Sequence, residues 1–573
     1  MFYSLLKVGE AVSKEELSFK KIERQGDLCF ITFDNDKKEV TFDRIKLGVG
    51  DEEKYAYIGE AQARKPQISI TTIYPERILG FLISENKNNE GKKLPREKFA
   101  LKVVADRLKG TETGRILNSV LEWYKPEEFK ENILSKCKSN CVDCALYTIK
   151  IIDNDKEIVI AQEDDYRKSL IFNGETEPGM CQFCGKNQVL KNPDYPNGTL
   201  LKVFIVDKKG FLPGLAESAV VLAHSICPEC RDKLVRGDQY VEEKLRVNIR
   251  KLNVFIIPDM SSEATKELLE KLTIDNEGFI LKALRQLYNA EMTVEQIANE
   301  IKEDARLTFV IGGKEQAKFR VRRVIPEVKY LRLIEIIKAF IQAKDVIFNQ
   351  AKDVSFNGLY DILPMEKISG RTDPKYFIEF FESMLLQIPL SKSYVYSVFL
   401  RSLRCKRYGS CVNSYTDKLS LEDLSLMAET YIYAMALLHI MDINVKAEQT
   451  EDPIKFAENL GLSEGLKGAF LLGVLTAYVG KEQHNKGDTK KSILDKIDFE
   501  GMDADDIIVY SNRLFDSLRN YRVLDSYTEN LYYEAVSRIK SGINDLDDPQ
   551  QNVFHILLGY SYKTNKFITS ANK

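Results

Sequence analysis

The stretch GMCQFCGKN, residues 179–187, places two cysteines three positions apart, with a glycine directly after the second. SICPECRDK, residues 225–233, repeats this spacing after an insert of 42 residues. Two residues between thiolates allow one tight turn to direct both sulfurs at a single ion, which predicts a tetrahedral zinc site. Gly185 suits such a turn, because glycine tolerates positive φ. The four predicted zinc ligands are Cys181, Cys184, Cys227 and Cys230.

A closed structural zinc is the favoured interpretation of these cysteines. Four thiolates fill the coordination sphere and leave no position for the water molecule that a catalytic zinc needs. Reduced cysteines without metal are the plain alternative. His224 lies three residues before Cys227 and is a candidate replacement ligand, although a histidine in that position more often packs beside the turn.

A second group of cysteines lies in CKSNCVDC, with Cys137, Cys141 and Cys144 at C-x₃-C-x₂-C spacing. Radical-SAM enzymes use this spacing to hold a four-iron cluster, but they place it after the first strand of a parallel barrel. Here the surroundings look irregular and no run of alternating strands and helices follows, so an incidental surface cluster is expected. Another metal or redox role is a second alternative. Cys405 and Cys411 have no evident partner and are expected to be packing residues.

The chain of 573 residues is too long for one hydrophobic core. The sequence predicts an α+β protein with a strand-rich N-terminal part and an embedded four-cysteine zinc ribbon. A mainly helical part follows and ends in a helical bundle. The expected divisions are an α/β domain at 1–260 with the ribbon at about 178–236, a mainly helical region at 261–450 with a β-hairpin at 307–325, and a bundle at 451–573.

Local patterns supply this outline. Short β-branched or aromatic runs predict strands at 27–36, 68–75, 156–162, 200–210 and 252–258. In the predicted hairpin, two strand-like runs flank Gly312 and Gly313. Helical spacing of apolar residues predicts helices at 100–110 and 116–125, and bundle helices that begin near Ser463 and Asp503 and end with one at 552–560.

Several enzyme classes lack their motifs in this sequence. There is no phosphate-binding loop of the Walker type and no H-E-x-x-H metal motif. The chain has four histidines, far apart, and none lies in an acid–base motif. We therefore expect a binding or scaffolding protein, not an enzyme. Ten cysteines without a signal-peptide pattern indicate a reducing compartment, here the cytoplasm, and no stretch is long enough to predict a membrane span.

Net charge is −3, so any nucleic-acid binding must come from local basic segments. Residues 91–110 and 314–332 each carry seven basic and two acidic residues, and 401–409 adds four basic side chains. A strand would place three basic residues of the second segment on one face, a row that suits phosphates along a backbone. Ordinary solvated faces are the alternative. The candidate nucleic-acid contacts are Lys92, Lys93, Lys98, Lys318, Arg320, Arg322, Arg323, Arg404 and Arg407.

Three features occur in a characteristic order along the chain. CQFCGKN and CPECRDKLVRGD come first, LYDILPM (359–365) lies within the helical region, and GAFLLGVLTAYVGKEQ (468–483) precedes VFHILLGYSY (553–562). From about residue 175 onward the chain resembles the large-subunit family of type I-B CRISPR Cascade complexes, the Cas-eight-b or Csh-one family.

The resemblance implies a non-catalytic subunit of an RNA-guided antiviral complex. Such a subunit recognises the protospacer-adjacent motif in duplex DNA, helps to open the strands into an R-loop, holds the displaced strand, and helps to recruit a helicase–nuclease. Its implied partners are crRNA, target DNA, and the backbone, crRNA 5′-end-binding and small subunits. The C-terminal bundle resembles the small subunit, which some members also make from an internal start. Met427, Met435 and Met441 are the candidates here.

Two other classes of function remain open from the sequence. One is a zinc- or iron–sulfur-dependent enzyme built around the cysteine clusters. The other is a zinc-stabilised scaffold with no nucleic-acid role. Salt-dependent DNA binding separates the scaffold from the Cascade subunit.

Overall fold

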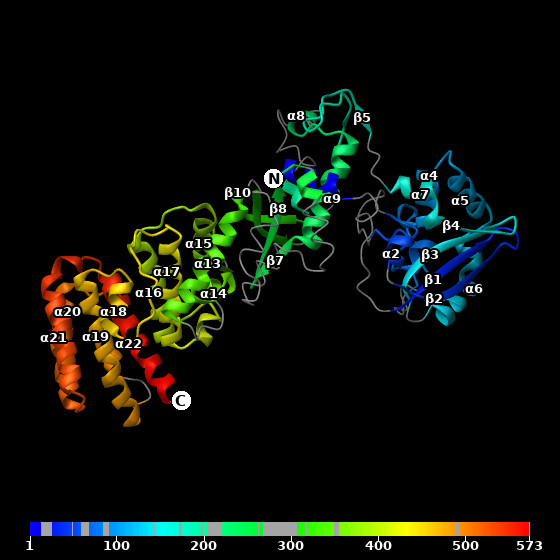
Figure 1. The fold of residues 1–573 in the computed structure, drawn as a ribbon. Helices are drawn as coiled ribbons and strands as arrows, with labels where there is room; N and C mark the ends of the chain where they lie inside the picture. Colours follow the sequence, from blue (N-terminus) through cyan, green and yellow to red (C-terminus); the bar gives the residue numbers. More distant parts are fainter. Residues whose placement is uncertain are drawn as a thin grey trace. The chain divides into compact units, whose positions relative to one another are not determined.

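The chain divides into two compact units. Figure 1 shows the helices and strands of the computed structural model. One unit holds 1–244, 261–270 and 314–320, and the other holds the remainder. The structure describes residues 1–12, 26–48, 50–58, 68–83, 91–141, 144–170, 175–193, 195, 199–203, 220–261, 263–266, 306–315, 318–348, 354–368, 370–488 and 492–571. The α+β class, with a strand-rich N-terminal part and a helical C-terminal region, is confirmed.

The first unit contains a four-stranded sheet in the order β2-β1-β3-β4. Strand β1 (Asp27–Asp34) pairs antiparallel with β2 (Glu39–Lys46) and parallel with β3 (Cys144–Asp153), which pairs antiparallel with β4 (Lys156–Val159). A parallel pair needs a long crossover connection. Here the crossover includes α2 (Asp51–Lys54), α3 (Pro75–Leu79), α4 (Ala100–Arg107), α5 (Glu112–Trp123) and α6 (Pro126–Asn140).

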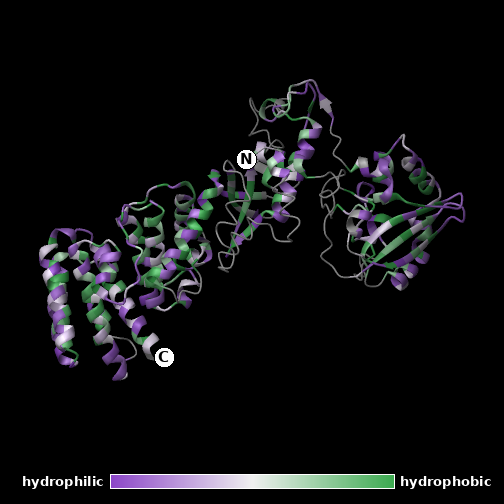
Figure 2. Cartoon of the chain, viewed as in Figure 1, coloured by the Kyte–Doolittle hydropathy of each residue, from purple (hydrophilic) through white to green (hydrophobic). Residues whose placement is uncertain are grey.

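Strands β1 and β3 form the centre of this unit's hydrophobic core. Every residue of β1 after Asp27 is buried, as expected for a strand covered on both faces. Figure 2 shows hydrophobic residues along the middle of these strands. Helices α4 and α5 contribute Leu101, Leu117 and Val120 to the same core.

The predicted strands were partly right. Strand β1 and the helices at 100–110 and 116–125 are confirmed, and so is a strand at 252–258. The run at 68–75 makes only an isolated bridge between Thr72 and Tyr147, and 156–162 turns into a 3₁₀ helix after Val159. At 200–203 the chain is 3₁₀-helical instead of extended, and 204–210 lies outside the described residues.

The rest of the first unit includes the segments that carry the four predicted zinc ligands. It comprises α7 (Asp164–Ser169), the short pair β5 (Thr176–Glu177) and β6 (Val189–Leu190), α8 (Val220–Ala223), α9 (Pro228–Lys244) and the first helix of the chain, α1 (Phe2–Ala11).

Helix α1 packs closely against α9 at a pair of glycines. A Cβ on Gly9 would lie 1.8 Å from the carbonyl oxygen of Lys233, and one on Gly237 would lie 1.9 Å from that of Leu5. Only glycine fits at both positions. An ion pair between Lys233 and Glu10, 2.7 Å long, joins the same helices.

A second four-stranded sheet has the order β10-β9-β8-β7. Its strands are β7 (Arg246–Ile249), β8 (Leu252–Asp259), β9 (Arg306–Glu315) and β10 (Lys318–Lys329). The two glycines expected at a turn lie inside β9, where Gly312 faces Asn253 of β8. The connection from β9 to β10 comes after Glu315 instead, because the glycines are accommodated within the paired strand.

Helices make up the remainder of the second unit. The first group is α13 (Tyr330–Ile347), α14 (Phe356–Ile362), α15 (Lys375–Leu386), α16 (Lys392–Tyr408) and α17 (Leu421–Leu437), with a small hairpin of β11 (Glu366–Ile368) and β12 (Arg371–Asp373). Helix α17 is buried on all sides from Leu424 to Ala436. Cys405 and Cys411, expected to have no partner, are joined by a disulfide across the end of α16.

The last helices are α18 (Pro453–Asn459), α19 (Glu464–Asn485), α20 (Ala504–Asn520), α21 (Ser526–Ser541) and α22 (Pro549–Ala571). Ser463 and Asp503 are the N-cap residues of α19 and α20, as predicted, and Asp503 forms a capping box with Asp506. The three-part division at residues 260 and 450 stays a prediction. Within the described ranges, no helix combines the length and the apolar character needed to cross a bilayer.

Candidate metal centre and basic surfaces

The four predicted zinc ligands lie together. The Sγ atoms of Cys181, Cys184, Cys227 and Cys230 are all within 4.8 Å of one another. Cys184 Sγ and Cys227 Sγ are 3.6 Å apart. Because a zinc ion bound by four thiolates keeps its sulfurs about 3.8 Å apart, this group is compact enough to hold a metal ion.

Backbone turns hold the two cysteine pairs in place. In the first pair, the N–H of Gly185 donates to the carbonyl of Cys181 (2.9 Å), and Gly185 has φ of 74°, as its position predicted. The N–H of Gln182 donates to the carbonyl of Ser225 (2.9 Å), which ties the first pair to the second. Pro228 is the first residue of α9, so the second pair spans the start of that helix.

Backbone donors also point at the sulfurs. The N–H of Cys227 donates to Cys181 Sγ (3.3 Å), and the N–H of Cys230 donates to Cys227 Sγ (3.4 Å). Burial raises the pKa of Cys181, but backbone N–H donors outweigh it and bring the pKa to about 7. Burial raises the pKa of Cys230. Buried thiols with donors aimed at them fit a cation that stabilises several thiolates at once.

His224 is a neighbour of this group and not one of its members. Its Nδ1 lies 3.1 Å from Gln182 Nε2, and its Nε2 lies 2.5 Å from the hydroxyl of Tyr195. The ring packs near Phe183 and Tyr195. Burial lowers the pKa of His224 to about 4, so the ring is neutral at physiological pH. Both ring nitrogens already have partners, which agrees with the neighbour interpretation.

The first basic segment, residues 91–110, lies in the first unit. Lys92 and Lys98 are exposed, and Lys93 pairs with Glu127 at 3.4 Å. The Nη2 of Arg107 instead donates to the carbonyl of Ile68 (2.8 Å). The exposed lysines are therefore the part of this segment that solvent and a phosphate backbone can reach.

The second basic segment is strand β10. Arg320, Arg322 and Arg323 are exposed, and alternation puts Arg323 on the face opposite the other two. Arg322 Nη1 lies 3.7 Å from Asp373 Oδ1. Arg323 forms a bidentate ion pair with the carboxylate of Glu382. The strand position of Lys318 continues the row of Arg320 and Arg322, while its side chain lies outside the described part of the chain.

The third basic segment is the last turn of α16. Arg404 pairs with Glu500 at 2.5 Å, and Arg407 pairs with Asp495. Each of these pairs is partly exposed. Exposed ion pairs contribute little to stability, so these arginines can exchange a carboxylate for a phosphate at low cost.

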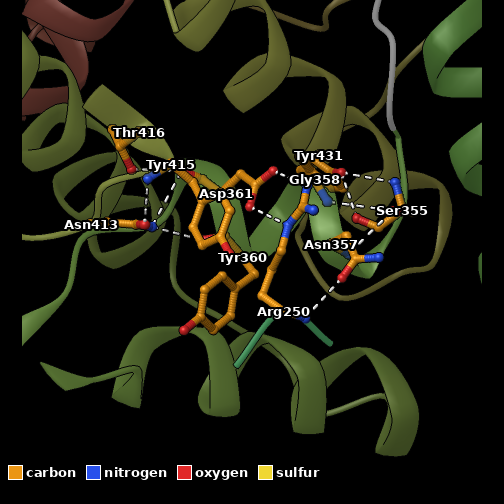
Figure 3. A network of polar contacts seen from close by, with 10 residues as sticks. All are labelled: Arg250, Ser355, Asn357, Gly358, Tyr360, Asp361, Asn413, Tyr415, Thr416 and Tyr431. Atoms are coloured by element: carbon orange, nitrogen blue, oxygen red, sulfur yellow. Dashed lines mark hydrogen bonds and ion pairs between the residues drawn. The ribbon is translucent and has the colours of Figure 1, made fainter. Parts of the chain in front are cut away.

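LYDILPM (359–365) is joined by hydrogen bonds to two other segments of the second unit, and these contacts are called the LYDILPM brace below (Figure 3). Arg250, in the turn between β7 and β8, donates from Nε to Asp361 Oδ1 (2.7 Å). Asn413 donates from Nδ2 to the carbonyls of Tyr360 (2.8 Å) and Leu363 (3.0 Å). These bonds fasten α14 to the sheet on one side and to the loop after α16 on the other.

The second cysteine cluster differs from its prediction. Cys137 and Cys141 are buried at the end of α6, and Cys144 begins β3, so the cluster lies neither on the surface nor in an irregular region. Cys29 of β1 joins it, with its Sγ 3.4 Å from Cys141 Sγ. The motif precedes a strand here, which does not match the radical-SAM arrangement. Sequence spacing could not reveal Cys29, because more than 100 residues separate it from the motif.

Two family models match the chain. The central domain of the CRISPR-associated protein TM1802 matches residues 178–328, and the C-terminal domain of the same family matches 354–573. The chain belongs to the CRISPR-associated TM1802 family. This confirms the resemblance found in the sequence. No curated protein matches the chain.

The TM1802 matches coincide with structural elements. The central-domain match contains the four thiols of the 181–230 site and the strands of the second sheet. The C-terminal match contains the LYDILPM brace and helices α14 to α22. The sheet that carries the second cysteine cluster lies before both TM1802 matches.

Proposed function

We propose that this TM1802-family chain is the non-catalytic large subunit of an RNA-guided DNA-surveillance complex of the type I-B Cascade kind. Family membership over residues 178–328 and 354–573 carries the proposal. In this role the chain works in the cytoplasm with crRNA, target DNA, and the backbone, crRNA 5′-end-binding and small subunits. It reads the protospacer-adjacent motif, helps to open the duplex, holds the displaced strand, and helps to recruit the helicase–nuclease.

The physical requirements of this role are modest. Guide pairing supplies sequence specificity, so the protein needs only a small reader of the adjacent motif and a basic track for the strand backbone. Strand β10 offers such a track. Successive residues on one face of a strand lie about 6.6 Å apart, close to the spacing of phosphates along an extended single strand.

Zinc is the metal that we propose for the 181–230 site, where it has a structural role. The ion would fix the start of α9 against the loop at 181–186, and α9 in turn packs against α1. An enzyme built on this site would need an open ligand position, which four thiolates do not leave.

The β10 track is tested by salt-dependent DNA binding of the assembled complex. The variant replaces Lys318, Arg320 and Arg322 by Ala. If these side chains bind phosphates, affinity falls, and the slope of log K against log salt becomes shallower by up to about 0.7 for each single-strand phosphate that is no longer neutralised. Binding is measured on target duplexes over a series of salt concentrations.

A matched variant removes the same charge elsewhere. Arg115, Lys125 and Lys156 are exposed on α5, before α6 and on β4, and their replacement by Ala should leave the slope unchanged. If both triple variants keep the affinity and slope of the wild type, β10 is not the DNA track. If the wild-type complex shows no target binding at all, the surveillance role itself is wrong.

A further inference from the structure

Four thiols from three segments of the first unit lie close together, outside the 181–230 site. They form a continuous series of contacts in the order Cys137, Cys141, Cys29 and Cys144. The central contact, between Cys141 Sγ and Cys29 Sγ, is 3.4 Å long. The side chains of Cys137 and Cys141 interact, and so do those of Cys29 and Cys144.

Regular secondary structure produces this convergence. Cys137 and Cys141 are four residues apart at the end of α6, so both point to the same side of the helix. Cys144 is the first residue of β3, and Asp27, two residues before Cys29 on β1, is its partner in the parallel pair. The end of α6 and the neighbouring starts of β1 and β3 thus bring their cysteines to one place.

One positive side chain lies beside the cluster. Arg44 of β2 is the antiparallel partner of Cys29, so their side chains share a face of the sheet. The positive charge of Arg44 lies near enough to interact with Cys141 and Cys144. Arg44 also pairs with Asp27 at 2.6 Å, which fixes its position beside the cysteines. A tetrathiolate metal site carries a net negative charge, which Arg44, shared with Asp27, offsets in part.

We propose that Cys29, Cys137, Cys141 and Cys144 bind a second zinc ion, separate from the 181–230 site. Four thiols give up four protons on binding Zn²⁺, and the product is a Zn(S)₄ group of charge −2. Cys141 and Cys144 supply the two-residue spacing of a metal-binding turn. Cys29 supplies the ligand that completes a set of four.

The contact geometry supports a metal more than a disulfide. The 3.4 Å between Cys29 Sγ and Cys141 Sγ is close to the roughly 3.8 Å of a zinc tetrathiolate and far from the bonding distance of about 2.05 Å. The contacts form a series instead of the compact group at 181–230, so the two end thiols must approach each other when the ion binds. Cys144 is only partly buried, unlike the other three, and has the most room to move.

A zinc ion here would have a clear structural effect. It would fasten the end of α6 to the starts of β1 and β3, and so close the long crossover between the parallel strands. The matched family domains start at residue 178, so this function would belong to a part of the chain that they do not cover.

The test counts zinc per polypeptide in the full-length protein. Protein purified with a reductant and dialysed against metal-free buffer is analysed for zinc by mass spectrometry. The wild type should contain two equivalents. C141S/C144S and C181S/C184S should each lose one equivalent. C405S/C411S, which removes two cysteines outside both clusters, should keep two.

Each result has a fixed meaning. One equivalent in the wild type, absent from C181S/C184S, overturns the second site and leaves the 181–230 site intact. Two equivalents that persist in a folded C141S/C144S also overturn it, and so does iron–sulfur absorbance near 400 nm or a disulfide within the cluster under reducing conditions. If C141S/C144S misfolds, the rate at which Cys144 of the wild type is alkylated tests the second site instead. Cys144 should react slowly with metal bound and faster after a chelator is added, and equal rates overturn the proposal.

Discussion

Glu429 is a carboxyl group buried in the middle of α17. It is 2% exposed, and its Oε2 has no hydrogen-bond partner among the described residues. Burial raises the pKa of Glu429 to about 8, because the charged form cannot be solvated there. The folded protein therefore keeps this side chain protonated near neutral pH, while the unfolded chain ionises it above a pKa of about 4.3.

This difference makes stability depend on pH. The folded-state pKa is the higher one, so the contribution of Glu429 is fully present below about 4.3 and is lost as pH rises toward 8. We expect Glu429→Gln, which cannot ionise, to raise the unfolding temperature relative to the wild type at pH 8.5, with a smaller difference at pH 5.5. Thermal unfolding at both values measures this.

Glu529→Gln, on the exposed face of α21, is the matched control and should leave the pH dependence unchanged. An equal difference between Glu429→Gln and the wild type at both pH values would contradict the assignment.

At the scale of single residues, some cysteine positions could be predicted from the sequence and others could not. The positions of Cys181, Cys184, Cys227 and Cys230 were predictable because each pair is recognisable from its local spacing. Cys29 was not, because only the parallel pairing of β1 and β3 brings it to the second cluster. The bond between Cys405 and Cys411 was missed for a related reason, since it depends on how the chain turns after α16.

At the level of elements, helices α19 and α22 approach each other through reciprocal glycines. A Cβ on Gly473 would lie 1.9 Å from the carbonyl oxygen of Ile556, and one on Gly559 would lie 1.9 Å from that of Phe470. These glycines belong to the two C-terminal stretches on which the family resemblance rested. Their function is thus to let two backbones approach closely inside the bundle.

Gly473→Ala should therefore destabilise the protein, although alanine is the better helix former by about 1 kcal/mol. The helices must separate to admit the methyl group, and overpacking of this kind costs about 1–3 kcal/mol or more. Gly480→Ala, in the same helix, meets only side-chain atoms at 3.2 Å or more and should cost much less. Denaturant midpoints for both variants measure the difference, and equal midpoints would show that the crossing is not tight.

Elements with strong local signals were predictable, and those that depend on partners were not. The caps of α19 and α20 and the strands β1 and β8 follow from short patterns. Strand β3 was overlooked beside the cysteine motif, although CALYTIKIID is rich in strand-forming residues. The glycines of β9 suggested a turn, but pairing with β8 holds them in an extended strand.

For the whole molecule, the helical part suggests which internal start is physically reasonable. Met427 and Met435 lie inside α17, so a product that began at either would carry a broken helix. Met441 follows α17, and a product from there would contain α18 to α22 complete. Helix α22 also packs against α16 and α17, so that product would present this face to another subunit.

We expect a short product to begin at Met441, if one is made. The native gene with a C-terminal tag is expressed, and the N-terminus of any small tagged product is mapped by mass spectrometry. Met441→Leu should abolish it, whereas Met427→Leu and Met435→Leu should not. A small product that starts at either of those two methionines would contradict this expectation.

The close packing of α1 on α9 also bears on how the protein is made. A ribosome completes α1 at Ala11 but does not reach the start of α9 until Pro228. At roughly 5–20 residues per second, this takes about 10 to 45 seconds. During that interval Leu5, Leu6 and Val8, all buried in the finished protein, have not yet met their partner helix. Helix α1 therefore stays without its partner helix while more than 200 residues are synthesised, and a nascent chain at this stage is expected to bind chaperones.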